Sequence, residues 1–332
     1  MSIKQRIKTQ IGSLMPSAVK KIYFAALWDE LRLLKNAGYG FLDVQGSTKP
    51  YIEVDGVILI GENSSCFQQG FFGSIMNELK LPATHANVAI DFVVRYKHPH
   101  IAIAFDHIKY PNRSRRFFHP QHFNLAQECQ SIPDKKKALL RKIFYPQEHW
   151  TIVDVGCYLG YGSLWASNLV KNGKVISVEA IERNYHIANA NRSSNDKGNW
   201  VVLNAAIWSQ AGEKVQMHET NKQGNAIDKN VVGESSQVEV LTTSIEKITQ
   251  DVGSTVDLLS LTVNGAEVDA IRGMQGMESK DFPKRVLAPG WYPLDGMSRA
   301  KILEPYLLGM GYKVVRTSGD FIFAWLPELE AR

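Results

Sequence analysis

A short strand, a turn rich in glycine and the start of a helix follow one another in residues 151–163, and a second strand ends at Glu179. The first strand is rich in β-branched residues, which indicates burial on both faces of a parallel sheet. Glycine lets the backbone approach a ligand where a Cβ would collide. A carboxylate at the end of the second strand can accept both hydroxyls of a ribose. The stretch therefore predicts a site for a ligand that contains a nucleoside.

Two nucleoside cofactors compete for this site. A dinucleotide-binding turn has the pattern Gly-x-Gly-x-x-Gly, but Tyr158 occupies the second glycine position. What remains is Asp154-x-Gly156 with Gly160 further along. This arrangement suits S-adenosylmethionine, because that ligand has an ammonium group for a carboxylate to contact and has no phosphate that needs a positive charge.

The composition is that of a globular chain of 332 residues, 44% hydrophobic and 21% charged, which is enough for one large domain and an extension. Three widely spaced cysteines give neither a disulfide framework nor a zinc pattern, so we expect a cytoplasmic protein without a metal. Residues 1–150 contain 20 Lys and Arg against 12 Asp and Glu, whereas residues 151–332 contain 18 against 21. The chain therefore divides into residues 1–145 and 146–332.

Residues 1–145 are expected to form an extension with helical and β-rich parts. Apolar residues at helical spacing, with lysines among them, predict a basic amphipathic helix in residues 1–37. Such a helix can rest on an anionic membrane surface or, as we favour, pack on its own domain or on a second subunit of a homo-oligomer. Hairpins are expected in residues 51–60, with a turn at Asp55-Gly56, and in residues 86–105. We expect this region to contact the acceptor substrate or a second subunit.

Basic and aromatic residues in 113–119, and five histidines between residues 98 and 122, raise two further hypotheses. Nucleic-acid binding is not expected, because the excess of positive charge is modest and no nucleic-acid-binding motif is present. The histidines lack the matched spacing and the acidic or cysteine partners of a metal site. One of them remains a candidate general base for a neighbouring site.

Strands and helices alternate from residue 151 onward. Strands are expected at 174–179, 200–204, 238–243, 256–263 and 285–288, and helices at 183–195, 267–273 and 298–308. Residues 205–217 are expected to extend the strand at 200–204 or to form an edge hairpin. A last pair of strands, 312–316 and 321–325, closes the chain. This order predicts an α/β fold with a doubly wound sheet and an antiparallel C-terminal hairpin.

The motifs between about residues 150 and 326 resemble, in kind and order, those of the FkbM family of S-adenosylmethionine-dependent methyltransferases. The matching pieces are residues 153–163, 178–184, 203–209 with Gly212, 238–243, 256–267, Gly273 and 311–312. The resemblance implies a class I methyltransferase fold and O-methylation of a hydroxyl on a sugar, glycan or natural product. In the site that it implies, Asp154 and the turn with Gly156, Tyr158 and Gly160 hold the amino-acid end of the cofactor, Glu179 holds the ribose, and Asn204 and Ala205 contact the adenine.

The chain departs from the family pattern in residues 260–267. The family has a segment like Lys-Ile-Asp-Val-Glu-Gly-Ala-Glu, and here Thr262 and Asn264 replace the first two acids while Glu267 keeps the third. The loss removes the obvious general base and any carboxylate-rich metal site. Thr262, Asn264 and Glu267 are the candidate catalytic residues. Either another group acts as the base, or the domain is a binding or scaffold module that transfers no methyl group.

Overall fold

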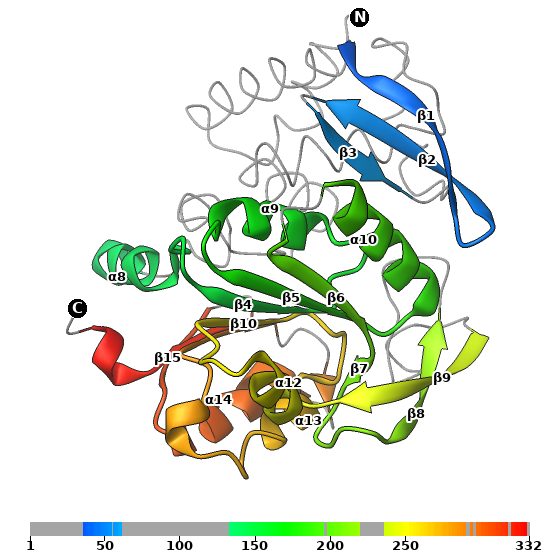
Figure 1. Ribbon diagram of the computed structural model, residues 1–332. Coiled ribbons are helices and arrows are strands. Elements are labelled where there is room, and N and C mark those ends of the chain that lie inside the picture. The colour runs from blue at the N-terminus through cyan, green and yellow to red at the C-terminus, as the bar shows by residue number, and fades with distance from the viewer. Residues whose placement is uncertain are drawn as a thin grey trace, which may run out of the picture.

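The computed structural model describes residues 36–54, 56–61, 133–195, 198–219, 236–289, 293–294, 297–317 and 320–330. A seven-stranded sheet forms its centre (Figure 1). The order of its strands is β14-β15-β11-β10-β4-β5-β6, and β15 runs antiparallel to both of its neighbours. The strands are β4 (Thr151–Val155), β5 (Lys174–Glu179), β6 (Trp200–Asn204), β10 (Leu258–Leu261), β11 (Arg285–Pro289), β14 (Lys313–Arg316) and β15 (Phe321–Trp325).

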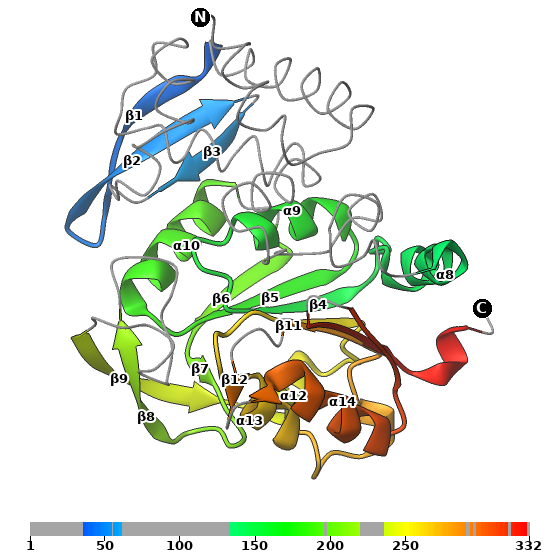
Figure 2. The same ribbon diagram turned by 180° about the vertical axis from the view of Figure 1, so that it is seen from behind.

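This strand order is that of the class I methyltransferase fold: five parallel strands with a C-terminal antiparallel hairpin at one edge. The predicted fold class is therefore confirmed. Helices α9 (Tyr161–Leu169) and α10 (Glu182–Ser194) cover one face of the sheet. Helices α12 (Ile245–Val252), α13 (Glu267–Arg272) and α14 (Arg299–Gly309) cover the other face, as both views show (Figures 1 and 2). The side chain of Ser244 accepts a hydrogen bond from Lys247 N and caps α12.

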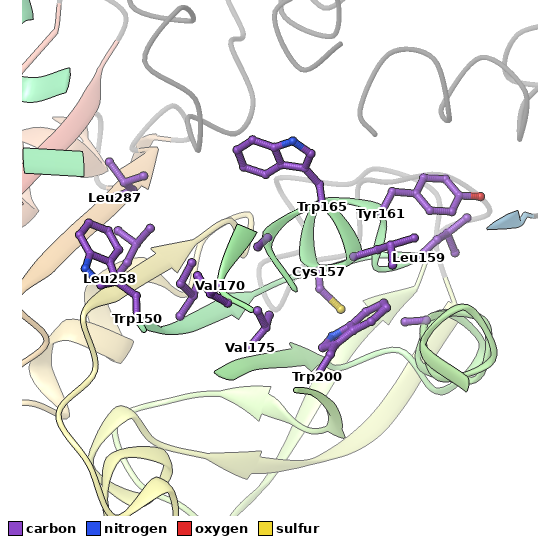
Figure 3. Packing of buried hydrophobic residues seen from close by; sticks show 14 of the residues in the cluster. Trp150, Cys157, Leu159, Tyr161, Trp165, Val170, Val175, Trp200, Leu258 and Leu287 are labelled. Atoms are coloured by element: carbon purple, nitrogen blue, oxygen red, sulfur yellow. The ribbon is translucent and has the colours of Figure 1, made fainter. Parts of the chain in front are cut away.

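The apolar cluster around α9 contains aliphatic and large aromatic side chains that come from different elements (Figure 3). Trp200 of β6 lies close to Cys157 in the glycine turn, and its indole nitrogen donates to Ser177 Oγ at 2.7 Å. This bond satisfies the one polar atom that the ring would otherwise bury. The alternate residues of β4 and β5 face α12–α14, where a second apolar cluster forms. Both faces of the central strands are thus covered, as their continuous apolar sequence requires.

Helix α8 (Asp134–Phe144) joins the sheet through Arg285, at the start of β11. The guanidinium group lies 3.9 Å from the centroid of the Trp150 ring and donates to the carbonyls of Ile143 and Asp257. Asp257 in turn accepts from Thr151 N at 2.9 Å and pairs with Lys284. This network lies at the end of β4 opposite the glycine turn, and its role is to hold the sheet together.

A separate three-stranded antiparallel sheet precedes this domain: β1 (Gly38–Val44), β2 (Ser47–Val54) and β3 (Val57–Ile60). The pairing of Val54 with Val57 confirms the predicted hairpin. Strand β1, which contains Gly38 and Gly40, is not among the elements predicted from the sequence, because glycine is uncommon in strands. At Gly40 a Cβ would lie 2.5 Å from the ring of Tyr51 on β2, so the tyrosine ring packs over this glycine.

The β1–β3 sheet lies above α9 and α10 in both views. Its last strand is bound by Asn191 of α10 and by Asn195, the residue that follows the helix. Asn191 accepts from Ile60 N at 2.6 Å and donates to Ile60 O at 2.9 Å, and Asn195 makes the same pair of bonds with Ile58 at 3.0 and 2.6 Å. Four residues along a helix span about 6 Å, close to the repeat of two residues along a strand. The two amides therefore match alternate residues of β3.

The same contact reaches the glycine turn. The amide nitrogen of Asn191 also donates to Leu159 O at 2.9 Å, and the hydroxyl of Tyr161 donates to Ile60 O at 2.8 Å. Tyr161 is 1% exposed and is the largest fully buried side chain of the described residues. The N-terminal sheet is thus tied to the turn between β4 and α9.

Residues 205–219 differ from the prediction. Strand β7 (Ala206–Ile207) pairs in parallel with β9 (Ser236–Thr243), and β8 (Lys214–Glu219) pairs antiparallel with the other side of β9. The segment neither extends β6 nor forms a simple edge hairpin. It builds a small third sheet beyond β6, because β9 returns between β7 and β8 from a later part of the chain.

Other predictions for the N-terminal half lie outside the described residues. They are the helix in 1–37 with its membrane or subunit contacts, the hairpin in 86–105, the basic stretch at 113–119 and the histidines between 98 and 122. Within the described part of the chain, no helix is both long and apolar enough to span a membrane.

We expect replacement of Asn191 by alanine to lower the free energy of unfolding by about 3 kcal/mol, because two buried backbone groups, Ile60 N and Leu159 O, would lose their bond to the amide, while Ile60 O keeps its bond from Tyr161. Urea denaturation followed by circular dichroism measures the effect. Asn189→Ala, on the same helix, removes an amide that contacts only Arg192 among the described residues and should cost less than about 1 kcal/mol. Equal costs for both variants would contradict the role of Asn191.

Candidate functional site

A pocket opens at the carboxyl ends of β4, β5 and β10, where open α/β sheets bind ligands. The space enclosed by its lining residues is about 560 Å³, a figure that includes the open mouth. Most of its lining residues come from the turns that follow these strands and from the small sheet beyond β6. They are Val155, Gly156, Tyr158, Val178, Glu179, Ala180, Asn184, Ala205, Ala206, Ile207, Met217, Thr262, Val263, Asn264 and Ala266.

The charge of this lining is one-sided. Glu179 is the only ionisable acid among the lining residues of the described chain, and none of them is lysine, arginine or histidine. The one acidic side chain of the described lining is thus a carboxylate that can accept hydrogen bonds from hydroxyl or ammonium groups of a ligand. A pyrophosphate would find no positive side chain in this described lining.

Gly156 lies where the glycine turn meets the loop after β10. It has φ +76°, and a Cβ at this position would be 2.1 Å from the carbonyl oxygen of Thr262. Both the left-handed backbone and the close approach require glycine. Gly156 N donates to Val178 O at 2.8 Å. The turn therefore packs between β5 and the loop that follows β10. Gly156 and Thr262, the two residues of this contact, both line the pocket.

Tyr158 occupies the position where a dinucleotide-binding turn has glycine. Its φ is +56°, a left-handed conformation that costs a residue with a Cβ about 1–2 kcal/mol. The conformation directs Tyr158 N to Glu179 Oε2 at 2.9 Å. The tyrosine thus adopts a backbone shape natural to glycine, and its side chain forms part of the pocket wall.

Glu179 accepts three hydrogen bonds from the described chain. Tyr158 N binds Oε2, while Ile181 N at 3.1 Å and Asn184 Nδ2 at 3.4 Å bind Oε1. The residue is 6% exposed and lines the pocket. Its carboxylate is fixed in place by the turn after β4 and by the start of α10.

Asp154 lies beneath the turn and does not line the pocket. It is 1% exposed, and its Oδ2 accepts from Ser163 Oγ at 2.6 Å. Its Oδ1 is buried and has no hydrogen-bond partner among the described residues. Gly160 also lies outside the lining, since a Cβ there would meet the ring of Trp200 at 2.9 Å. Both residues support the turn from the side of α9.

Of the two residues expected to contact the adenine, one lines the pocket and the other does not. Ala205 lines the pocket, whereas Asn204 does not. The amide nitrogen of Asn204 donates to Glu179 O at 3.0 Å and to Ala180 O at 3.1 Å. Asn204 therefore holds the backbone after Glu179.

Thr262 and Asn264 both lie in the pocket lining, in the loop after β10 that contacts the glycine turn at Gly156. Asn264 has φ +44°, a conformation that asparagine tolerates better than most residues. Glu267, the third candidate catalytic residue, is not in the lining. It is 2% exposed and accepts from Gly265 N at 2.9 Å, so it supports the loop from behind. Burial raises the pKa of Glu267 to about 7, against the opposing effect of backbone N–H groups and of Arg299.

Several lining residues were not predicted as site residues. Ile207 and Met217 come from the small third sheet, whose pairing with β9 no local pattern in residues 205–217 indicated. Asn184 lies five residues after Glu179 in the first turn of α10. Its place at a helix start beside a strand-end acid was the available signal.

The sequence matches no protein-family model and no curated protein. Solved structures with a similar fold include precorrin-6y C5,15-methyltransferase from Geobacter metallireducens (14% identity, TM-score 0.34, 60% of this chain and 89% of that one). A second is methyltransferase FkbM from Methylobacillus flagellatus (12% identity, TM-score 0.40, 78% of this chain and 72% of that one). A third is a SAM-dependent methyltransferase from Aquifex aeolicus (14% identity, TM-score 0.32, 63% of this chain and 97% of that one). Each TM-score is below 0.5, so these similarities carry no information about the function of this chain.

We expect Gly156→Ala to lower the free energy of unfolding by about 3 kcal/mol, because it adds a backbone clash to the strain of a left-handed residue. Gly212→Ala is the matched control: Gly212 has φ +85° and no atom within 4 Å of an added Cβ, so only about 1 kcal/mol is expected. Chemical denaturation of both variants measures the difference. If the two changes cost the same, the contact with Thr262 is not what requires glycine at position 156.

The raised pKa of Glu267 predicts a dependence of stability on pH. The folded protein keeps this proton up to about pH 7, whereas the unfolded chain releases it near 4.5. The contribution of the protonated Glu267 to the free energy of unfolding is therefore complete below pH 4.5. It falls by about 3 kcal/mol as the pH rises to 7. In Glu267→Gln, which cannot titrate, this part of the pH dependence should vanish in unfolding measured from pH 4.5 to 8. Identical pH profiles for wild type and variant would contradict it.

Proposed function

We propose that this protein is an S-adenosylmethionine-dependent methyltransferase that methylates a hydroxyl group of a small molecule or glycan. The observation that carries the proposal is the charge of the pocket: one carboxylate, Glu179, and no basic side chain in the described lining. S-Adenosylmethionine has a sulfonium and an ammonium group and no phosphate. The class I fold adds support, because its strand ends place a nucleoside at this edge of the sheet.

The described residues suit each part of the cofactor. Glu179 lies at the end of β5, where a carboxylate can bind ribose hydroxyls. Ala205, Ile207 and Met217 give an apolar wall for the adenine ring. The unpartnered Oδ1 of Asp154 lies under the turn that would hold the amino-acid end, where it would orient the turn by charge and not by direct contact.

Thr262 and Asn264 are the polar residues of the opposite wall and would orient the acceptor. When bound, S-adenosylmethionine supplies a methyl group on a sulfonium that is a good leaving group. The acceptor oxygen forms the new bond to the methyl carbon, the electron pair of the broken bond stays on sulfur, and the hydroxyl proton is released. Holding the two reactants in line supplies much of the acceleration.

Glu267 does not serve as the base in this proposal, because its carboxyl group is turned into the loop behind the pocket and bonds Gly265 N. Thr262 and Asn264 are hydrogen-bonding groups whose role is orientation. A histidine from residues 98–122 stays a candidate for proton removal, as the sequence predicts.

The proposal is tested by calorimetry with S-adenosylhomocysteine. We expect micromolar binding by the wild type and a loss of at least tenfold in Glu179→Ala, because the ribose would lose its charged acceptor. Glu182→Ala is the matched control. Glu182 is the first residue of α10, three residues after Glu179, and it contacts His186 outside the pocket. No binding by the wild type, or equal losses in both variants, would contradict the cofactor assignment.

Methyl transfer is tested separately, with radiolabelled S-adenosylmethionine and pools of hydroxylated acceptors. Label on an alkali-stable product supports O-methylation, and we expect Asn264→Ala to lower the rate at least tenfold without weakening cofactor binding. Cofactor binding with no transfer to any acceptor would favour the alternative, a non-catalytic binding or scaffold module.

A further inference from the structure

Asn184 lies in the wall of the pocket beside Glu179. It is in the first turn of α10 and is 1% exposed. Its Nδ2 donates to Glu179 Oε1 at 3.4 Å, and this contact fixes the orientation of the amide, because an ionised carboxylate can only accept. The other amide atom, Oδ1, is buried and has no hydrogen-bond partner in the described part of the chain.

A buried amide oxygen without a donor costs about 1–3 kcal/mol. Such an atom in a pocket wall indicates a donor that the bound ligand brings. The donor must lie close to the Glu179 carboxylate, because Asn184 contacts that group directly. The part of the proposed cofactor that reaches Glu179 is the ribose, and its two hydroxyls are donors.

Glu179 has too few acceptor sites left for both hydroxyls. A carboxylate offers about four lone-pair sites. At least three are used, by Tyr158 N, Ile181 N and Asn184 Nδ2, so at most one remains for the ligand. A ribose diol presents two hydroxyl donors, and the second needs another acceptor nearby. The Oδ1 atom of Asn184 meets this need.

We propose that Glu179 and Asn184 bind the ribose as a pair, the carboxylate accepting from one hydroxyl and Asn184 Oδ1 accepting from the other. The proposal rests on the proposed function, and it makes Asn184 a specificity-determining residue for the cis-diol of the cofactor. The amide has two tasks in this arrangement. Its nitrogen donates to the Glu179 carboxylate and positions it, and its oxygen accepts a hydrogen bond from a ribose hydroxyl.

Calorimetry with three probes tests the pair: S-adenosylhomocysteine and its 2′-deoxy and 3′-deoxy analogues. Asn184→Ala should weaken binding of S-adenosylhomocysteine about tenfold, the effect of one buried hydrogen bond. For the analogue that lacks the hydroxyl bound by Asn184, the variant and the wild type should differ by less than about twofold. For the other analogue the tenfold loss should persist.

A purely structural role gives a different pattern. If Asn184 only positions Glu179 or α10, the alanine variant weakens binding of all three probes by the same factor, and the proposal is wrong. It is also wrong if Asn184→Ala binds S-adenosylhomocysteine as the wild type does. Wild-type protein that binds none of the probes contradicts the proposed function itself and is thereby distinguished from a failure of the diol pair.

Two further variants complete the design. Asn184→Leu keeps the shape of the side chain without the amide, so it reports on the same bond if the alanine variant does not fold, and the same probe pattern is expected. Asn189→Ala removes an amide from the same helix outside the pocket. It should leave the affinities for all three probes within about twofold of the wild type.

Discussion

The carboxylate of Glu179 is the group on which the site depends. It receives N–H groups from the turn after β4 and from the start of α10, so the ends of two strands and a helix converge on one side chain. These bonds require Tyr158 to adopt a left-handed backbone, and the strain of that conformation is offset by a hydrogen bond to a charged acceptor. The pocket is shaped before any ligand arrives.

The second constraint comes from the opposite wall. Gly156 and the carbonyl of Thr262 are so close that no Cβ fits between them. The loop after β10 therefore takes its position from the turn after β4, and Glu267 holds the same loop from behind. Thr262 and Asn264 are the polar groups that this loop presents to the pocket.

Much of the domain could be predicted from sequence, because strands covered on both faces and glycine turns leave local signals. The bounds of β5 and β6 agree with the prediction residue for residue. Long-range pairing could not be predicted in this way. The small sheet that supplies Met217 depends on β9 returning between two earlier strands, and the orientation of Glu267 away from the pocket depends on the fold of its loop. Local pattern names residues near a site, but it does not say which way their side chains point.

The asparagine contacts of α10 have a further consequence for β3. Within the described chain β3 is the last strand of its sheet, and the outer edge of such a strand invites pairing with another molecule. Asn191 and Asn195 offer that edge the same donors and acceptors that a neighbouring strand would offer. The helix thereby closes the sheet against edge-to-edge aggregation without adding a strand. Two side chains cover this edge of β3, and they do so from the domain that contains the pocket.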